Sequence, residues 1–279
     1  MITAALAVGF AMAAMQVGPN PRGDVDPIPE ELRELRRRQR SDAPIVPDED
    51  RMAACLARSQ TGSVATVVEA AAWADGTDGQ TKANALHCKG VAEIELGRFA
   101  EAAASFETAV AALSGNDAEY AARLGAMAGG AHLLGGDAAR AATVLEQAKL
   151  AAEQGAPALI AGQIDLDRAK AYVAMDDTVR AQEALADARR TIPRDPQSWL
   201  LSATLARRLN DLPLAQDFIT QARALVPARP ELLLEAGLIA VLNGDDEQAR
   251  RDWTAILDAP DPAPEAQTAR FYLEQLDTP

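Results

Sequence analysis

Pairs of small residues recur along the middle of this chain at a fixed spacing of twelve. The pairs are Gly90 and Ala102, Gly129 and Ala141, Ala169 and Ala181, Ala203 and Ala215, and Gly237 and Ala249. Successive pairs lie 39, 40, 34 and 34 residues apart, and a larger apolar residue follows four positions after each alanine. Small residues at matching heights let two antiparallel helices approach closely, and we expect the larger residue to fill the groove between neighbouring hairpins. The spacing predicts a stack of helical hairpins.

The composition favours helices and restricts the kind of partner. Alanine, the strongest helix former, accounts for 62 of the 279 residues. Lysine and arginine number 27 against 41 aspartates and glutamates, which gives a formal net charge of −14. A chain this acidic is poorly suited to phosphate backbones or anionic lipid surfaces. We therefore expect an all-α protein that does not bind nucleic acid.

Signals for helix ends fall at the places that the hairpins require. Gly97, Gly136 and Gly244 stand where the first helix of a pair must stop, and glycine readily adopts the left-handed conformation of a helix cap. Pro193 and Pro227 fall between units, where one helix must end before the next begins. These residues support the hairpin interpretation.

The unit that begins at Pro196 matches a known pattern. Its small, aromatic and bulky residues are Trp199, Ala203, Ala215, Ile219, Ala222 and Pro227. This 34-residue pattern resembles the tetratricopeptide repeat, and the resemblance covers about residues 82–258. It implies an all-α fold, a right-handed helical-hairpin solenoid. Two departures are Pro213, which is unusual in an interhelix turn, and the 5–6 extra residues of the first two units, which we expect in longer second helices or in loops.

The resemblance also implies where a partner would bind. In tetratricopeptide-repeat proteins, partners lie in the concave groove lined by the first helices. Carried over residue by residue, the groove residues are Arg123, Met127, Gln163, Asp167, Lys170, Gln197, Leu201, Thr204, Arg208, Glu231 and Glu235. Lys170 and Arg208 are the candidates for holding an acidic group. For each of these residues, an ordinary place in the packing between units is the alternative.

The two ends of the chain carry other signals. Residues 1–17 are predicted to be a signal peptide, because a short apolar run ends in small residues typical of a secretory cleavage site; a buried helix is the alternative. Residues 18–47 are predicted to be a proline-rich tether with a short charged helix, and 48–81 a degenerate helix pair. Residues 82–260 would form about five repeat units, and 261–279 a C-terminal capping helix.

The two cysteines are candidates for a disulfide. Cys55 and Cys88 lie 33 residues apart, close to one repeat length. They should therefore lie at similar heights on adjacent helices, where two thiols can bridge. The sequence leaves a disulfide and two reduced thiols both open.

Sequence motifs for catalysis or metal binding are missing. The chain has no GxxxxGK[ST], GxGxxG, HExxH or GxSxG motif. His87 and Cys88 are neighbours, but adjacent residues of a helix point about 100° apart and cannot act on one another. We expect no catalytic residue, no metal and no cofactor.

These observations predict a non-catalytic scaffold that binds a protein or peptide. The partner would be an extended peptide or a helix in the groove, and the location would be the bacterial periplasm or the secreted fraction, with membrane contact only through the signal peptide. No small-molecule substrate is expected. Three alternatives are an intracellular adaptor or regulator, an accessory subunit of an enzyme that uses His87 or His132, and a structural oligomer.

Overall fold

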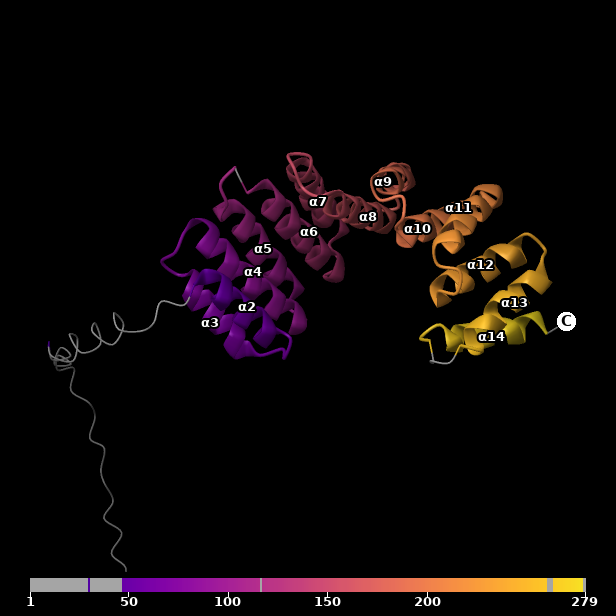
Figure 1. Ribbon diagram of the computed structural model, residues 1–279, viewed down its shortest axis with the longest axis horizontal. Coiled ribbons are helices and arrows are strands. Elements are labelled where there is room, and N and C mark those ends of the chain that lie inside the picture. Colours follow the sequence, from indigo (N-terminus) through magenta and orange to yellow (C-terminus); the bar gives the residue numbers. More distant parts are fainter. Residues whose placement is uncertain (1–29, 31–46, 116, 260–262, 278–279) are drawn as a thin grey trace, which may run out of the picture. The chain divides into compact units, whose positions relative to one another are not determined.

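The computed structural model describes residues 30, 47–115, 117–259 and 263–277 of the chain. The predicted signal peptide and nearly all of the predicted tether lie outside these residues. Within the described part, every regular element is an α-helix, and the helices follow one another as hairpins in chain order (Figure 1). The prediction of an all-α helical-hairpin solenoid is confirmed. None of the described helices has the length and apolar character that crossing a membrane requires.

Five hairpins form the body of the stack. Their first and second helices are α4 (Gly79–Glu95) and α5 (Phe99–Ala112), α6 (Ala118–Leu134) and α7 (Ala138–Ala152), α8 (Ala158–Ala174) and α9 (Thr178–Thr191), α10 (Pro196–Arg208) and α11 (Leu212–Leu225), and α12 (Pro230–Leu242) and α13 (Asp246–Leu257). Two shorter helices precede them, α2 (Asp48–Ser59) and α3 (Val64–Ala74), and both pack on α4. The last described helix, α14 (Ala266–Leu276), packs on α13.

The close approach of the two helices in a hairpin depends on the small residues of the first helix. A Cβ atom added to Gly129 would lie 2.4 Å from Cγ of Leu145, and one added to Gly237 would lie 2.2 Å from Nε1 of Trp253. The large residue therefore packs on the glycine of its own hairpin, whereas the spacing alone suggested only the groove between hairpins. Leu145 fills that groove too, because it belongs to one apolar cluster with Leu166 of α8.

The turns inside the hairpins share one backbone geometry. A residue with positive φ ends each first helix, as in Gly136 (+80°) and Gly244 (+79°). The same position holds Asp176 (φ 58°) and Asn210 (φ 61°) in the third and fourth hairpins. Aspartate and asparagine are the L-residues that most readily adopt this conformation, so these hairpins turn without a glycine. The next residue is aspartate in four hairpins, and its carboxylate accepts a hydrogen bond from the backbone of the second helix.

Pro213 fits this turn because of its place in the second helix. It lies in the first turn of α11, where a proline needs no hydrogen-bond donor, and Asp211 caps that helix by accepting from the backbone nitrogen of Leu214 at 3.2 Å. The proline that looks unusual in the sequence is therefore an ordinary helix-start proline.

The extra residues of the first two units lengthen first helices, not second ones. The second helices α5 and α7 have 14 and 15 residues, against 14 in both α9 and α11. The first helices α6 and α8 have 17 residues each, against 13 in α10 and α12. The expectation of longer second helices or loops is wrong for most of the extra residues, because they form an added turn at the start of the following first helix.

Candidate functional site

The predicted groove residues all lie on the first helices of the hairpins. Arg123 and Met127 belong to α6, and the three residues Gln163, Asp167 and Lys170 belong to α8. The remaining residues are Gln197, Leu201, Thr204 and Arg208 on α10 and Glu231 and Glu235 on α12. The structure brings four of them together at one pocket and gives the others different surroundings.

That pocket lies between α8 and α10 and has a volume of about 220 Å³. Four predicted groove residues, Lys170, Leu201, Thr204 and Arg208, line it together with Ala169, Val173, Ala174, Leu185 and Leu205. Its walls are therefore mostly aliphatic. The two cationic residues come from different helices, which makes the pocket a product of the stacking of two hairpins.

The two cations of this α8–α10 pocket differ in their pairing. Lys170 Nζ lies 2.8 Å from Oδ1 of Asp167, and 45% of the lysine side chain is exposed. Arg208 is exposed and forms no ion pair within the part of the chain that the structure describes. An acidic group that enters the pocket would meet one free guanidinium and one exposed ammonium.

Glu235 pairs with a side chain of a neighbouring helix and is not available to a partner protein. Its carboxylate is buried and accepts from Arg207 at 2.6 Å (Nε to Oε1) and 3.2 Å (Nη2 to Oε2). This two-bond pair joins α10 to α12, so Glu235 has the packing role that the sequence left as its alternative. Glu231 pairs with Arg229 at 3.1 Å.

A second and larger pocket of about 480 Å³ lies among α2, α4 and α6. Arg123 is the only predicted groove residue that lines it. Asn84 and His87 of α4 also line it, and the sequence interpretation did not include them. Asn84 occupies the same repeat position as Arg123, Gln163, Gln197 and Glu231, so extending the register to the first unit would have indicated it. His87 has no counterpart among the predicted groove residues.

A hydrogen-bond network forms the floor of this second pocket. The hydroxyl of Tyr120 donates to Oδ1 of Asn84 at 3.0 Å. Nδ1 of His87 lies 3.1 Å from the same hydroxyl oxygen, and it must carry the proton because the tyrosine has already used its own. Burial, and then the positive charge of Arg123, lower the pKa of His87 to about 4. His87 is therefore neutral near pH 7.

Replacing His87 with glutamine is expected to reduce the loss of stability in mild acid. His87 has a pKa of about 4 in the folded chain and about 6.5 when unfolded. Because the unfolded chain binds more protons between these values, stability falls as the pH falls from 6.5 towards 4. From about pH 7 to pH 5 this group should cost about 2 kcal/mol, and urea unfolding at both pH values measures it. An equal decline in wild type and His87→Gln would contradict the prediction.

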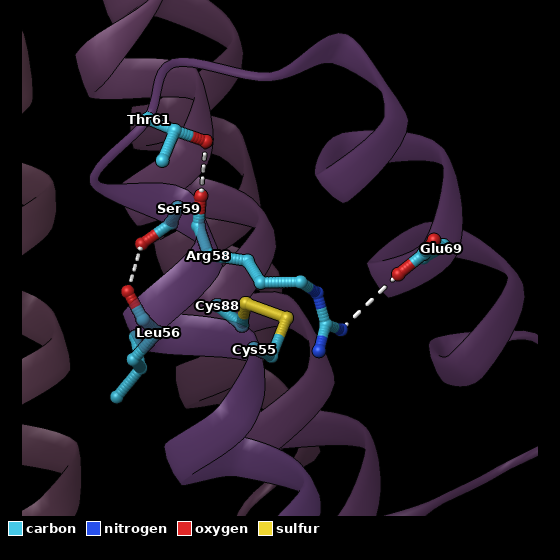
Figure 2. The surroundings of a disulfide bond; sticks show 7 residues. All are labelled: Cys55, Leu56, Arg58, Ser59, Thr61, Glu69 and Cys88. Carbon is cyan, nitrogen blue, oxygen red and sulfur yellow. Dashed lines mark hydrogen bonds and ion pairs between the residues drawn. A yellow bond between two sulfur atoms is a disulfide. The ribbon is translucent and has the colours of Figure 1, made fainter.

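A disulfide lies directly beside the second pocket. Cys55 of α2 is joined to Cys88 of α4, with the two Cα atoms 6.1 Å apart (Figure 2). An ion pair of 3.1 Å between Arg58 and Glu69 connects α2 to α3. Cys88 is the neighbour of His87 in sequence, so the bridge holds α2 against the helix that forms the floor of the pocket.

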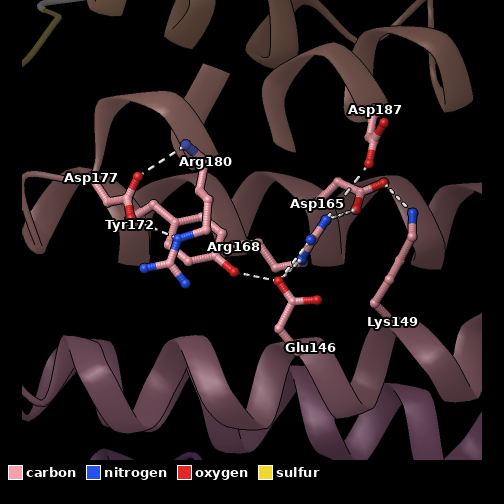
Figure 3. Close-up of polar contacts among 8 residues, drawn as sticks. All are labelled: Glu146, Lys149, Asp165, Arg168, Tyr172, Asp177, Arg180 and Asp187. Atoms are coloured by element: carbon pink, nitrogen blue, oxygen red, sulfur yellow. Dashed lines mark hydrogen bonds and ion pairs between the residues drawn. The ribbon is translucent and has the colours of Figure 1, made fainter. Parts of the chain in front are cut away.

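A charged cluster joins α7, α8 and α9 (Figure 3). Asp165 is fully buried and accepts from Lys149 at 2.7 Å and from Arg168 at 2.9 Å. Arg168 also donates to Glu146 at 2.7 Å, and the hydroxyl of Tyr172 donates to that glutamate. Burial raises the pKa of Asp165, although both cations oppose that rise. These charges satisfy one another, so the cluster holds the hairpins together.

His132 belongs to hairpin packing as well. Its Nε2 lies 2.7 Å from Oε1 of Glu107, which also accepts from Arg140 at 2.6 Å. Over the described ranges, histidine, cysteine and carboxylate side chains form no group of three that could hold a metal.

Comparisons with known proteins identify the fold. No protein-family model matches the chain, and no curated protein matches its sequence. Among solved structures, the pilF protein of Pseudomonas aeruginosa has a TM-score of 0.58 at 16% identity, covering 82% of this chain and 100% of that chain. BtubC from P. vanneervenii has a TM-score of 0.56 at 13% identity, covering 82% and 93%. YrrB, described as a TPR protein with an unusual peptide-binding site, has a TM-score of 0.50 at 15% identity, covering 68% and 91%. The fold is that of tetratricopeptide-repeat proteins.

Proposed function

We propose that this chain is a non-catalytic interaction scaffold that holds an extended segment of a partner protein along its first helices. The observation that carries the proposal is the α8–α10 pocket, where an aliphatic wall lies beside Lys170 and Arg208. Pockets of this kind fix a peptide by placing an apolar side chain while charged groups at the rim set its orientation.

The charges around the α8–α10 pocket indicate what the partner segment carries. The chain as a whole has a net charge of −14, so a strongly acidic partner would be repelled at a distance. Lys170 and Arg208 give the pocket a local positive charge in this negatively charged chain. We infer a segment with an apolar side chain next to one acidic group, flanked by residues that add little negative charge.

The proposal places the protein in the bacterial cell envelope. Its support is the apolar run at residues 1–15, which contains the small residues Ala11 and Ala13 of a secretory cleavage site. An intracellular adaptor of the same fold is the alternative. Amino-terminal sequencing of the protein from its host separates the two, because an intact Met1 would end the export proposal.

Reversing the charges of the α8–α10 pocket tests the proposed function. The probes are two labelled peptides, one with a leucine next to a glutamate and one with lysine in place of that glutamate. Wild type should bind the glutamate peptide more tightly, and Lys170→Glu/Arg208→Glu should weaken that binding at least about tenfold. Fluorescence anisotropy measures both affinities.

The matched control is Arg270→Glu, a charge reversal at an exposed residue of α14 outside the pocket. It makes the net charge more negative, by half as much as the double variant does. It should leave the affinity for the glutamate peptide within about twofold of wild type. Equal losses in the pocket variant and the control would show that only net charge matters. Equal binding of both peptides to wild type would overturn the proposal.

A further inference from the structure

Three successive second helices carry a cation at the same repeat position. The residues are Lys149, Arg189 and Arg223. Each directly follows an alanine, and that alanine lies seven residues after the second member of the small-residue pair in the same unit. Figure 3 shows Lys149 beside Asp165. Lys149 Nζ lies 2.7 Å from Oδ2 of Asp165, and Arg223 Nη2 lies 2.9 Å from Oδ1 of Asp252. Both carboxylates are buried. Two of the three cations therefore have a buried counterion.

Arg189 has no such counterion. Its guanidinium donates to the hydroxyl of Ser202 and lies 4.3 Å from the ring centre of Phe218 and 5.6 Å from that of Trp199. No carboxylate of the described residues pairs with it. Burial lowers the pKa of Arg189, which means that its surroundings disfavour the charge. A half-buried guanidinium with only a hydroxyl and aromatic faces as partners is incompletely compensated.

A pocket of about 220 Å³ lies against this guanidinium, among α9, α10 and α11. Its polar lining comes from Gln182, Arg189 and Ser202. The remaining lining is apolar and consists of Leu185, Leu205, Ala206, Leu214 and Phe218. Leu185 and Leu205 also line the α8–α10 pocket, so the two pockets share these two leucines as lining residues. The α9–α11 pocket contains none of the predicted groove residues.

We propose that the α9–α11 pocket binds an aliphatic carboxylate, whose charged end pairs with Arg189 and whose stem packs against Leu185, Leu214 and Phe218. The carboxylate would supply the counterion that Asp165 and Asp252 supply to the equivalent cations. A guanidinium and a neighbouring hydroxyl together suit the two oxygens of a carboxylate. The volume accommodates one short chain, either from a free carboxylic acid or from the apolar carboxyl-terminal residue of a protein.

Hexanoate tests the α9–α11 pocket in the full chain. The melting temperature of wild type should rise with hexanoate concentration, beyond the effect of sodium chloride at equal ionic strength, because a ligand that binds only the folded state stabilises it. Arg189→Met keeps a stem that packs on Phe218 and removes the charge, and its hexanoate affinity should be at least about tenfold weaker. Each variant is compared with itself without hexanoate, so a change in basal stability does not affect the result.

Arg223→Met is the matched control, because it removes an equivalent cation that already has its counterion. It should retain the wild-type response to hexanoate while its own melting temperature falls, since Asp252 would be left buried without a partner. Arg189→Met should melt close to wild type. A hexanoate response that persists in Arg189→Met would overturn the proposal, as would the loss of that response in Arg223→Met.

A peptide pair distinguishes the two sources of the carboxylate. The peptides end in leucine and differ only in a free or an amidated carboxyl terminus. Binding of the free-acid peptide alone, lost in Arg189→Met and retained in Lys170→Glu/Arg208→Glu, would identify a protein terminus as the ligand. A response to hexanoate without peptide binding would identify a free acid. The absence of any response to both probes would overturn the proposal and leave the proposed function of the α8–α10 pocket untouched.

Discussion

Replacing Gly129 with leucine is expected to destabilise the protein by about 3 kcal/mol or more. A single Cβ atom at this position would already lie 2.4 Å from Cγ of Leu145 and 2.5 Å from its Cδ2. Leu145 is fully buried and belongs to the cluster with α8, so it has no space into which it can turn. The added side chain must therefore separate α6 from α7. Urea unfolding followed by circular dichroism measures the loss.

The neighbouring glycine supplies a matched control. A Cβ atom added to Gly130 meets no atom within 4 Å, although both glycines lie in the interior of α6 (Ala118–Leu134). Both substitutions gain the same helix propensity, about 1 kcal/mol. Gly130→Leu should thus unfold at the same or a higher urea concentration than wild type. If Gly129→Leu and Gly130→Leu had equal stability, the close approach of α6 and α7 could not be the role of Gly129.

The sequence predicts the hairpins well because their contacts repeat. The requirement for a small residue at Gly129 or Gly237 recurs in every unit, and recurrence separates it from the high background of alanine. The place of the extra residues of the first two units is not predictable in the same way. An added turn at the start of α6 or α8 and an added turn at the end of the preceding second helix leave the same spacing in the sequence.

The sequence also predicts the turns inside the hairpins only in part. Gly136 and Gly244 are recognisable because glycine is the usual residue with positive φ. Asp176 and Asn210 adopt the same conformation (φ 58° and 61°), but each is an ordinary surface residue in the sequence. Only the alignment of all five turns assigns them this role.

The sequence predicts which residues lie on the first helices, but it does not predict which side chains pair with them. The repeat register places Lys170, Arg208 and Glu235 on first helices, and the structure agrees. Whether a charge in that register is free depends on which side chain of the neighbouring helix reaches it. Arg207 forms an ion pair with Glu235, whereas Arg208, one residue later, lines the α8–α10 pocket. Neighbouring residues of a helix point about 100° apart, so Arg207 and Arg208 meet different side chains.

The double substitution Cys55→Ser/Cys88→Ser is expected to cost about 4 kcal/mol of stability. The bridge closes a loop with a sequence separation of 33 residues, and the loss of chain entropy in the unfolded state for such a loop corresponds to about that value. The loss of stability should be concentrated at the start of the stack, because α2 has its main contacts with α3 and α4. Hydrogen exchange should show α2 and α3 opening first, with α10–α13 unchanged.

Treatment of wild type with a reductant provides the control for this substitution. Reduced wild type and Cys55→Ser/Cys88→Ser should melt at the same temperature, below oxidised wild type, and reductant should not change the double variant. Opening of α2 also removes Glu49 and Met52 from the wall of the second pocket, which exposes His87 to water. Its pKa should then rise from about 4 towards 6.5, and titration by NMR follows that change. A His87 pKa that stays near 4 after reduction would show that α2 remains docked on α4 without the disulfide.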